Sequence, residues 1–224
     1  NMMKNLYSEH PYNWVPIGSM DHLNAAQLDE FMNFYKKFYI PNNATLSIAG
    51  DIDAAATKEL VEAYFGTIPA GTPVVQPTVE EPALGGEKSL TVYDNIQLPA
   101  VMMGYRMPPQ TSDDAYALQM ASTVLSGGPS SRMYKRLVDQ DQTALQVFAF
   151  PFTLEQGGAF ITFSLANAGK GIDDMTPALE EEIEKLQTEL ISEREFEKIQ
   201  NQMESGFIQS NSTMAGIAES LADY

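Results

Sequence analysis

The fold is most clearly indicated by residues 38–69, which read FYIPNNATLSIAGDIDAAATKELVEAYFGTIP. Pro41 ends the helix that precedes it, because the residue before a proline is disfavoured in the α region. Residues 44–49 then alternate between apolar and polar side chains, which is the two-residue period of a half-buried strand. Asp53 can cap the next helix, and Gly66 ends it. The stretch therefore predicts a helix, strand, helix unit.

The residues on either side of this unit predict a lead-in, a helix and a linker. Residues 1–23 contain prolines and a glycine that prevent a long regular element. Asn24 is expected to cap a helix that continues to Phe38, with Gln27 in the capping-box position. Residues 71–86 are rich in proline and glycine and have no hydrophobic period, so they predict a stiff, extended linker and a domain boundary.

The residues after the linker predict one layered fold. Strands that pair as neighbours, with helices gathered between them, give an antiparallel sheet backed by helices, which is an α+β fold. In its last strand Ile161, Phe163 and Leu165 should share one face. The expected elements are strands at 89–93, 100–107, 144–150 and 159–165, a helix capped by Ser112 or Asp113, a short helix after Ser130 with Met133 and Leu137 inward, a helix at 176–191 with Pro177 at its first position, and a helix capped by a box of Ser192 and Glu195.

Composition excludes several classes of partner. The chain has 224 residues, 44% of them hydrophobic, and a net charge of −17, which opposes binding to nucleic acid or to anionic membranes. The acidic residues form either a solvated surface or an acidic wall that would favour basic peptides. The chain has no cysteine, so disulfides and thiolate zinc sites are excluded. No apolar run is long enough to span a membrane.

Four segments, in this order, carry a family resemblance. They are His10-Pro11-Tyr12, Ile17-Gly18-Ser19, the unit at 38–69, and residues 125–134, which read LSGGPSSRMY. Over nearly the whole chain the sequence resembles the pitrilysin/insulinase family of zinc metallopeptidases, the inverzincins. The resemblance implies a layer fold like that of LuxS metalloenzymes and mitochondrial processing peptidase. It assigns residues 1–70 to the C-terminal part of a first peptidase-like domain, 71–86 to a linker, and 87–224 to the N-terminal part of a second, homologous "inactive" domain.

The family's zinc motif is absent from this chain. Zinc peptidases of this kind need neutral imidazoles, a carboxylate ligand and a general-base Glu, and the family supplies them with a His-Xaa-Xaa-Glu-His helix. The chain has only His10 and His22, and Leu6 stands where the first His before Glu9-His10 would be required. His10 is therefore interpreted as a structural residue in a turn. We expect no catalytic residue and no metal ligand in this chain, and zinc in the parent protein, bound outside this segment.

A second family feature is an Arg and Tyr pair that reaches the substrate from the domain opposite the zinc. Alignment on the Ser-Ser-Arg segment places Val138 and Leu145 at these positions, and neither can donate a hydrogen bond to an oxyanion. By the resemblance, a half without this pair is the zinc-bearing half, which favours a zinc-bearing parent. Arg132, Tyr134 and Arg136 are the remaining substrate-facing candidates, and the alternative for them is a surface or helix-positioning role.

The predicted function follows from this resemblance. The chain is interpreted as a non-catalytic segment of a zinc endopeptidase that degrades or processes peptides, walling the substrate chamber. The alternatives are a scaffold or assembly subunit of the same fold, and an unrelated module that binds peptides on a strand edge. The expected partners are peptide substrates through the parent and a homologous peptidase half or subunit. One hypothesis is that residues 43–49 complete the sheet of 88–165 as a permuted domain, either within one chain or swapped between the two chains of a homodimer. A periplasmic or secreted bacterial parent is a hypothesis from family style.

Overall fold

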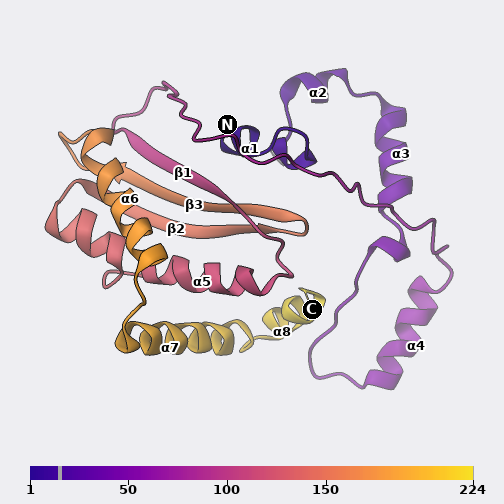
Figure 1. Cartoon of the computed structure of the whole chain (residues 1–224). Coiled ribbons are helices and arrows are strands. Elements are labelled where there is room, and N and C mark those ends of the chain that lie inside the picture. Colours follow the sequence, from indigo (N-terminus) through magenta and orange to yellow (C-terminus); the bar gives the residue numbers. More distant parts are fainter. Residues whose placement is uncertain (15–16, 224) are drawn as a thin grey trace. The chain divides into compact units, whose positions relative to one another are not determined.

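A computed structural model describes residues 1–14 and 17–223 of the chain. The chain divides into two compact units (Figure 1), which are described one at a time. The first, the sheet unit, comprises residues 1–15 and 79–200; the second, the helical unit, comprises residues 16–78 and 201–224. The division into two homologous domains with limits at residues 70 and 87 concerns the ancestry of the segments, and it stays a prediction.

The sheet unit contains a three-stranded antiparallel sheet. Its strands are β1 (Ala100–Met107), β2 (Ala144–Leu154) and β3 (Gly157–Ala166), in the order β1-β3-β2. Strands β2 and β3 form the predicted hairpin, and β1 pairs antiparallel with β3. The helices α5 (Asp113–Ser126) and α6 (Ile172–Thr188) and the π-helical segment η3 (Tyr134–Gln140) pack against this sheet. An antiparallel sheet backed by helices confirms the predicted α+β class.

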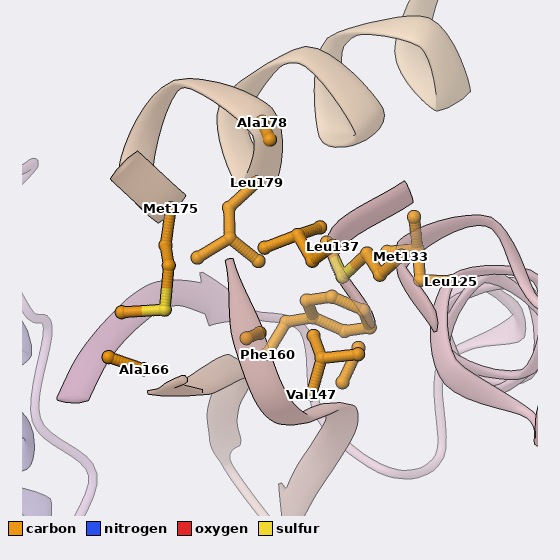
Figure 2. Packing of buried hydrophobic residues seen from close by; sticks show 11 residues of the cluster. Leu125, Met133, Leu137, Val147, Phe160, Ala166, Met175, Ala178 and Leu179 are labelled. Atoms are coloured by element: carbon orange, nitrogen blue, oxygen red, sulfur yellow. The ribbon is translucent and has the colours of Figure 1, made fainter. Parts of the chain in front are cut away.

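The core lies between the sheet and these helices. Figure 2 shows Met175 and Leu179 of α6 pointing from the helix toward the sheet, and Phe160 of β3 next to Val147 of β2. Met133 and Leu137 are fully buried, as predicted. The other buried members of the cluster are Leu125, Ala144, Ala149, Ala166 and Ala178. The sheet face that packs on the helices carries Phe160, so the predicted row of Ile161, Phe163 and Leu165 lies on the opposite face and is only half-buried.

Two predicted strands are absent from the structure. Residues 44–49 and 89–93 belong to no strand, whereas the strand at 100–107 is present as predicted. An alternating pattern gives a strand only where a neighbouring strand accepts its hydrogen bonds. Among the described residues, the ladders join β3 to β1 and to β2 and include neither segment.

Three helix boundaries differ from the prediction. The helix expected from Asn24 is two helices, α2 (Met20–Ala25), capped by Ser19, and α3 (Leu28–Phe38), because Ala26 has an extended backbone between them. Gln27 and Glu30 form the capping box of α3. Helix α6 begins at Ile172, where the Asp174 carboxylate accepts a hydrogen bond from the Gly171 N–H, so Pro177 lies inside the helix and not at its first position. It ends at Thr188, which leaves Leu190 fully exposed.

Other caps are as predicted. Ser112 caps α5, Asp53 caps α4 (Ala54–Phe65), and Ser192 with Glu195 caps α7 (Glu193–Ser210). The helical unit contains α2, α3, the 3-10 turn η2 (Pro41–Asn43), α4, the part of α7 that follows Gln200, and an unpredicted α8 (Met214–Asp223). Asn42 connects η2 to residues 70–71. Its backbone N–H donates to the Ala70 carbonyl, and its side-chain amide donates to the Gly71 carbonyl.

Candidate functional site

A cluster of hydrogen bonds and one ion pair in the sheet unit joins the lead-in to the linker. Glu81 of the linker accepts four hydrogen bonds from the lead-in: the Ser8 N–H (2.7 Å) and hydroxyl (2.8 Å) donate to Oε1, and the N–H groups of Glu9 (2.9 Å) and His10 (2.7 Å) donate to Oε2. Arg106 of β1 donates from Nη2 to Oε1 of Glu81 at 3.0 Å. We call Ser8, Glu9, His10, Glu81 and Arg106 the lead-in clamp.

Arg106 connects three segments of the chain. Its Nε donates to the Leu6 carbonyl and its Nη1 to the Pro82 carbonyl, in addition to the ion pair with Glu81. Its guanidinium also lies over the Tyr7 ring, 5.4 Å from the centroid. A planar guanidinium can donate in several fixed directions at once, which suits a residue that holds the lead-in and the linker on one strand.

The clamp stabilises the charged form of Glu81. Partial burial alone would raise the pKa of this carboxyl, but the donors at His10, Ser8 and Glu9 outweigh it and hold the pKa at about 2. Successive backbone N–H groups that converge on one carboxylate form an anion-binding nest. Here the chain's own glutamate occupies the nest, so the cluster is a structural joint.

An aromatic cluster next to the clamp binds the β2–β3 hairpin. The Tyr7 hydroxyl donates to the Gly158 carbonyl at 2.7 Å and accepts from the Gly158 N–H at 2.9 Å. The Tyr12 hydroxyl accepts from the Gln156 N–H at 3.1 Å. His10 is buried; its Nδ1 accepts from the Tyr12 N–H, so its Nε2 carries the proton and donates to Gln156 Oε1 at 3.1 Å. His10 thus has the structural role in a turn that was predicted.

The structure brings Arg132 to the start of α7. Its Nε and Nη2 donate to the two carboxylate oxygens of Glu195 at 3.0 and 3.1 Å, a bidentate pair. The hydrogen bond from Arg132 and those from Ser192 lower the pKa of Glu195 to about 2 although partial burial opposes this. Lys198 donates to the Ser130 hydroxyl at 2.7 Å, so two polar contacts join α7 to the turn before η3.

The other two candidates do not converge with Arg132. Tyr134 packs against the hydrophobic core, and Arg136 pairs with Asp141 (2.6 Å) and Glu181 (3.5 Å). Val138 also packs on the core, and Leu145 is half-exposed at an irregularity of the β2–β3 ladder. The three candidates therefore lie on one short segment, but their side chains have different surroundings: an ion pair with α7, the hydrophobic core, and surface carboxylates.

Sequence reasoning missed the lead-in clamp. The only local signals were a charged residue, Arg106, within an apolar strand and an acidic residue, Glu81, within a proline-rich linker. For metals, no group of three or more His, Asp or Glu side chains in residues 1–14 and 17–223 is arranged to hold an ion. None of the helices in that same part of the chain is long and apolar enough to cross a membrane.

Comparison with known proteins identifies the family. The model of the peptidase M16 inactive domain matches residues 25–203, which is more than half of the chain. The chain belongs to the peptidase M16 inactive-domain family. This confirms the resemblance that the four sequence segments carry.

The M16 relatives agree in sequence and in fold. The zinc protease PqqE of Helicobacter pylori is 28% identical over 221 residues, covering 97% of this chain and 50% of the relative. The crystal structure of a protease from Helicobacter pylori, also 28% identical, has a TM-score of 0.92 and covers 100% of this chain and 55% of that chain. A peptidase M16 inactive domain from Pseudomonas fluorescens has the same fold, with a TM-score of 0.80 at 16% identity over 99% of this chain and 52% of that chain. The chain therefore spans about half the length of the relatives it matches.

Proposed function

We propose that this M16 inactive domain is a non-catalytic wall of the peptide chamber in a zinc-dependent endopeptidase that degrades or processes peptides. Zinc is bound by another part of the parent protein, and the chain holds that part against its partner half. The observation that carries the proposal is the match to the inactive-domain family together with a relative that is named a zinc protease and is about twice as long.

The lead-in clamp supports the holding role. By the family resemblance, residues 1–14 belong to the domain that precedes the linker, and β1 and the hairpin belong to the domain that follows it. Arg106, Glu81 and Tyr7 join these segments by charge-assisted and buried hydrogen bonds, which are stronger and more directional than ordinary surface contacts. A joint of this kind transmits the position of one domain to the next.

The three candidate residues are proposed mainly for positioning. The bidentate pair of Arg132 with Glu195 supports a role in holding η3 and α7 together, and Tyr134 supports the core. Arg136 remains the substrate-facing candidate, because its side chain is 37% exposed and its partners are surface carboxylates. A peptide carboxylate could replace those partners at little cost, since exposed ion pairs are weak.

The test compares this chain with the full-length parent protein. Zinc content and chelator-sensitive cleavage of a mixed fluorogenic peptide pool are measured on both. We expect the parent to bind zinc and cleave, and the chain to do neither. Adding the chain to a separately expressed zinc-bearing half should restore cleavage if the chain is a chamber wall.

Two results would contradict the proposal. Cleavage by the chain alone would show that it has its own catalytic site. A full-length parent that neither binds zinc nor cleaves would replace the peptidase by the scaffold alternative, in which the fold serves assembly. A matched parent with Arg136→Ala tests the substrate contact separately: an increase in KM without loss of bound zinc supports it, and an unchanged KM removes it.

A further inference from the structure

The sheet face that points away from α5 and α6 carries a patch of large apolar side chains. The strand registers place Met102 and Phe148 on either side of Phe163, and Phe150 opposite Ile161 in the next row. Met102 is 55% exposed and Phe148 is 48% exposed, and the rings of Phe148 and Phe163 stack with centroids 6.3 Å apart. We call Met102, Phe148, Phe150 and Phe163 the outer-face patch. Contiguous exposed apolar side chains of this kind mark interaction surfaces.

Helix α1 (Met2–Leu6) already covers one end of this face. The Met2 side chain lies so close to Gly104 that a Cβ on this glycine would be 2.7 Å from the methionine Sδ. Met2 and Ile161 both pack against the small cluster formed by Leu6, Tyr7 and Ala159. Because Gly104 pairs with Ile161, the covered area ends one row before Met102 and Phe163. The patch is therefore continuous with an interface that the lead-in has begun.

The direction of α1 indicates which segment covers the remaining part of the outer-face patch. Met2 lies at Gly104, and Tyr7 lies at Gly158, which pairs with Met107 at the end of β1. Helix α1 thus follows β1 in the same direction, and Met102 and Ala100 are the residues of β1 on the same face before Gly104. A strand residue advances about 3.3 Å and a helix residue about 1.5 Å, so about nine helical residues would cover the four strand steps from Gly104 to Ala100.

We propose that the outer-face patch is the docking surface of a helix that continues α1 toward its N-terminus in the longer protein. This chain covers only 50% of the zinc protease PqqE of Helicobacter pylori, so a relative of that length has residues outside the matched region. The occupant is an amphipathic helix whose apolar residues stand three and four positions before Met2 and Met3, the spacing that keeps them on the same helix face. This inference holds whether or not the parent cleaves peptides.

The absence of cysteine from the chain allows a direct test. Met102→Cys places one thiol in the patch, and Tyr116→Cys places one on the solvent side of α5, where Tyr116 is 67% exposed. Thiol labelling by a maleimide is timed in this chain and in the longer protein with its natural preceding residues. We expect Cys at 102 to react rapidly in the chain and roughly tenfold or more slowly in the longer protein, since labelling then needs local opening. Labelling at position 116 should be the same in both, which controls for reagent and folding.

Four results would overturn the proposal. Equal labelling at position 102 in both proteins would show that nothing covers the patch. Protection in this chain that is lost on dilution would assign the patch to a second copy. Protection in the longer protein that appears only when peptide is added would assign it to substrate. A preceding sequence with charged residues at the stated positions would overturn it before any protein is made.

Discussion

The sheet unit and the helical unit differ in what holds them together. The sheet unit buries a cluster between its sheet and helices, with Met133, Leu137 and Leu179 fully buried. In the helical unit, none of the described residues 17–78 and 201–223 is buried, although α3 carries an aromatic stripe in which Phe31 and Phe34 are more than half exposed. An amphipathic sequence pattern therefore places apolar side chains on one face of a helix. These side chains form a core only where a second apolar surface packs against that face.

The family interpretation of the two segments, with limits at residues 70 and 87, stays a prediction, and its bounds differ from those of the two units. The sheet unit contains the strands and helices that pack on each other, so its apolar residues find partners in the chain. The helical unit has many exposed apolar side chains. Examples are Leu46 and Ile48 in an extended segment and Leu60 and Tyr64 on α4. If the resemblance holds for residues 16–70, it predicts that these side chains are covered by another part of the same domain.

The largest predicted effect distinguishes the core of the sheet unit from the exposed apolar side chains of the helical unit. Leu179→Ala in α6 should lower the free energy of unfolding by about 2–5 kcal/mol, because it opens a cavity at a fully buried site. Leu60→Ala in α4 removes the same atoms from a side chain that is 58% exposed and should change it by less than about 0.5 kcal/mol. Urea denaturation followed by circular dichroism measures both. Similar losses for the two variants would contradict the comparison.

The next effect concerns the lead-in clamp, which joins residues 8–10 to Glu81 and to β1 within the sheet unit. Glu81→Ala removes the acceptor of three successive N–H groups, and the amides of Ser8, Glu9 and His10 should exchange with solvent roughly tenfold or more faster. Glu80→Ala is the matched control, because this neighbouring glutamate is exposed. Hydrogen exchange resolved by NMR measures each amide. Unchanged protection in Glu81→Ala would show that the lead-in is held by Tyr7 and Tyr12 alone.

A smaller effect is the dependence of this joint on pH. The pKa of Glu81 falls from an ordinary 4.5 to about 2 in the folded chain, so its contribution to stability is fully present above pH 4.5 and is lost as the pH falls toward 2. Between these values the folded state should lose stability faster in the wild-type chain than in Glu81→Gln. Denaturation at several pH values in this window measures the difference. Parallel curves for the two proteins would contradict the assignment.

The smallest effect is expected for the pair of Arg132 and Glu195. A double-mutant cycle with Arg132→Ala and Glu195→Ala should give a coupling of about 0.5–1 kcal/mol, because the pair is bidentate but partly exposed to solvent. The control is Arg194→Ala, at an exposed residue of the same helix turn. A coupling near zero would leave the positioning role of Arg132 without energetic support.

The sequence predicted those features that depend on neighbours in the chain. The caps at Asp53 and Ser192 need a partner three residues away, and the β2–β3 hairpin needs only two strands and a short turn. It failed for residues 44–49 and 89–93, because a strand depends on a ladder partner that local pattern does not reveal.

The functional features divided in the same way. The family could be recognised from short motifs such as residues 125–134. The zinc motif could be seen to be absent because no His-Xaa-Xaa-Glu-His occurs in the sequence. The lead-in clamp could not be predicted, because Glu81 meets N–H groups 71 to 73 residues away and an arginine 25 residues away. The environments of Arg132 and Arg136 likewise depend on α7 and α6, which follow much later in the chain.

We propose that the sheet unit is held by its own core and that the helical unit is stabilised by the rest of the parent. Limited digestion with trypsin tests it directly, because exposed lysines are available in both: Lys36, Lys37 and Lys58 in the helical unit and Lys135 in the sheet unit. We predict rapid cleavage at the first three in this chain, survival of the segment from 79 to 200, and protection of all four sites in the full-length parent. Cleavage at Lys135 as fast as at Lys58, or equal digestion of Lys58 in the chain and in the parent, would contradict the account.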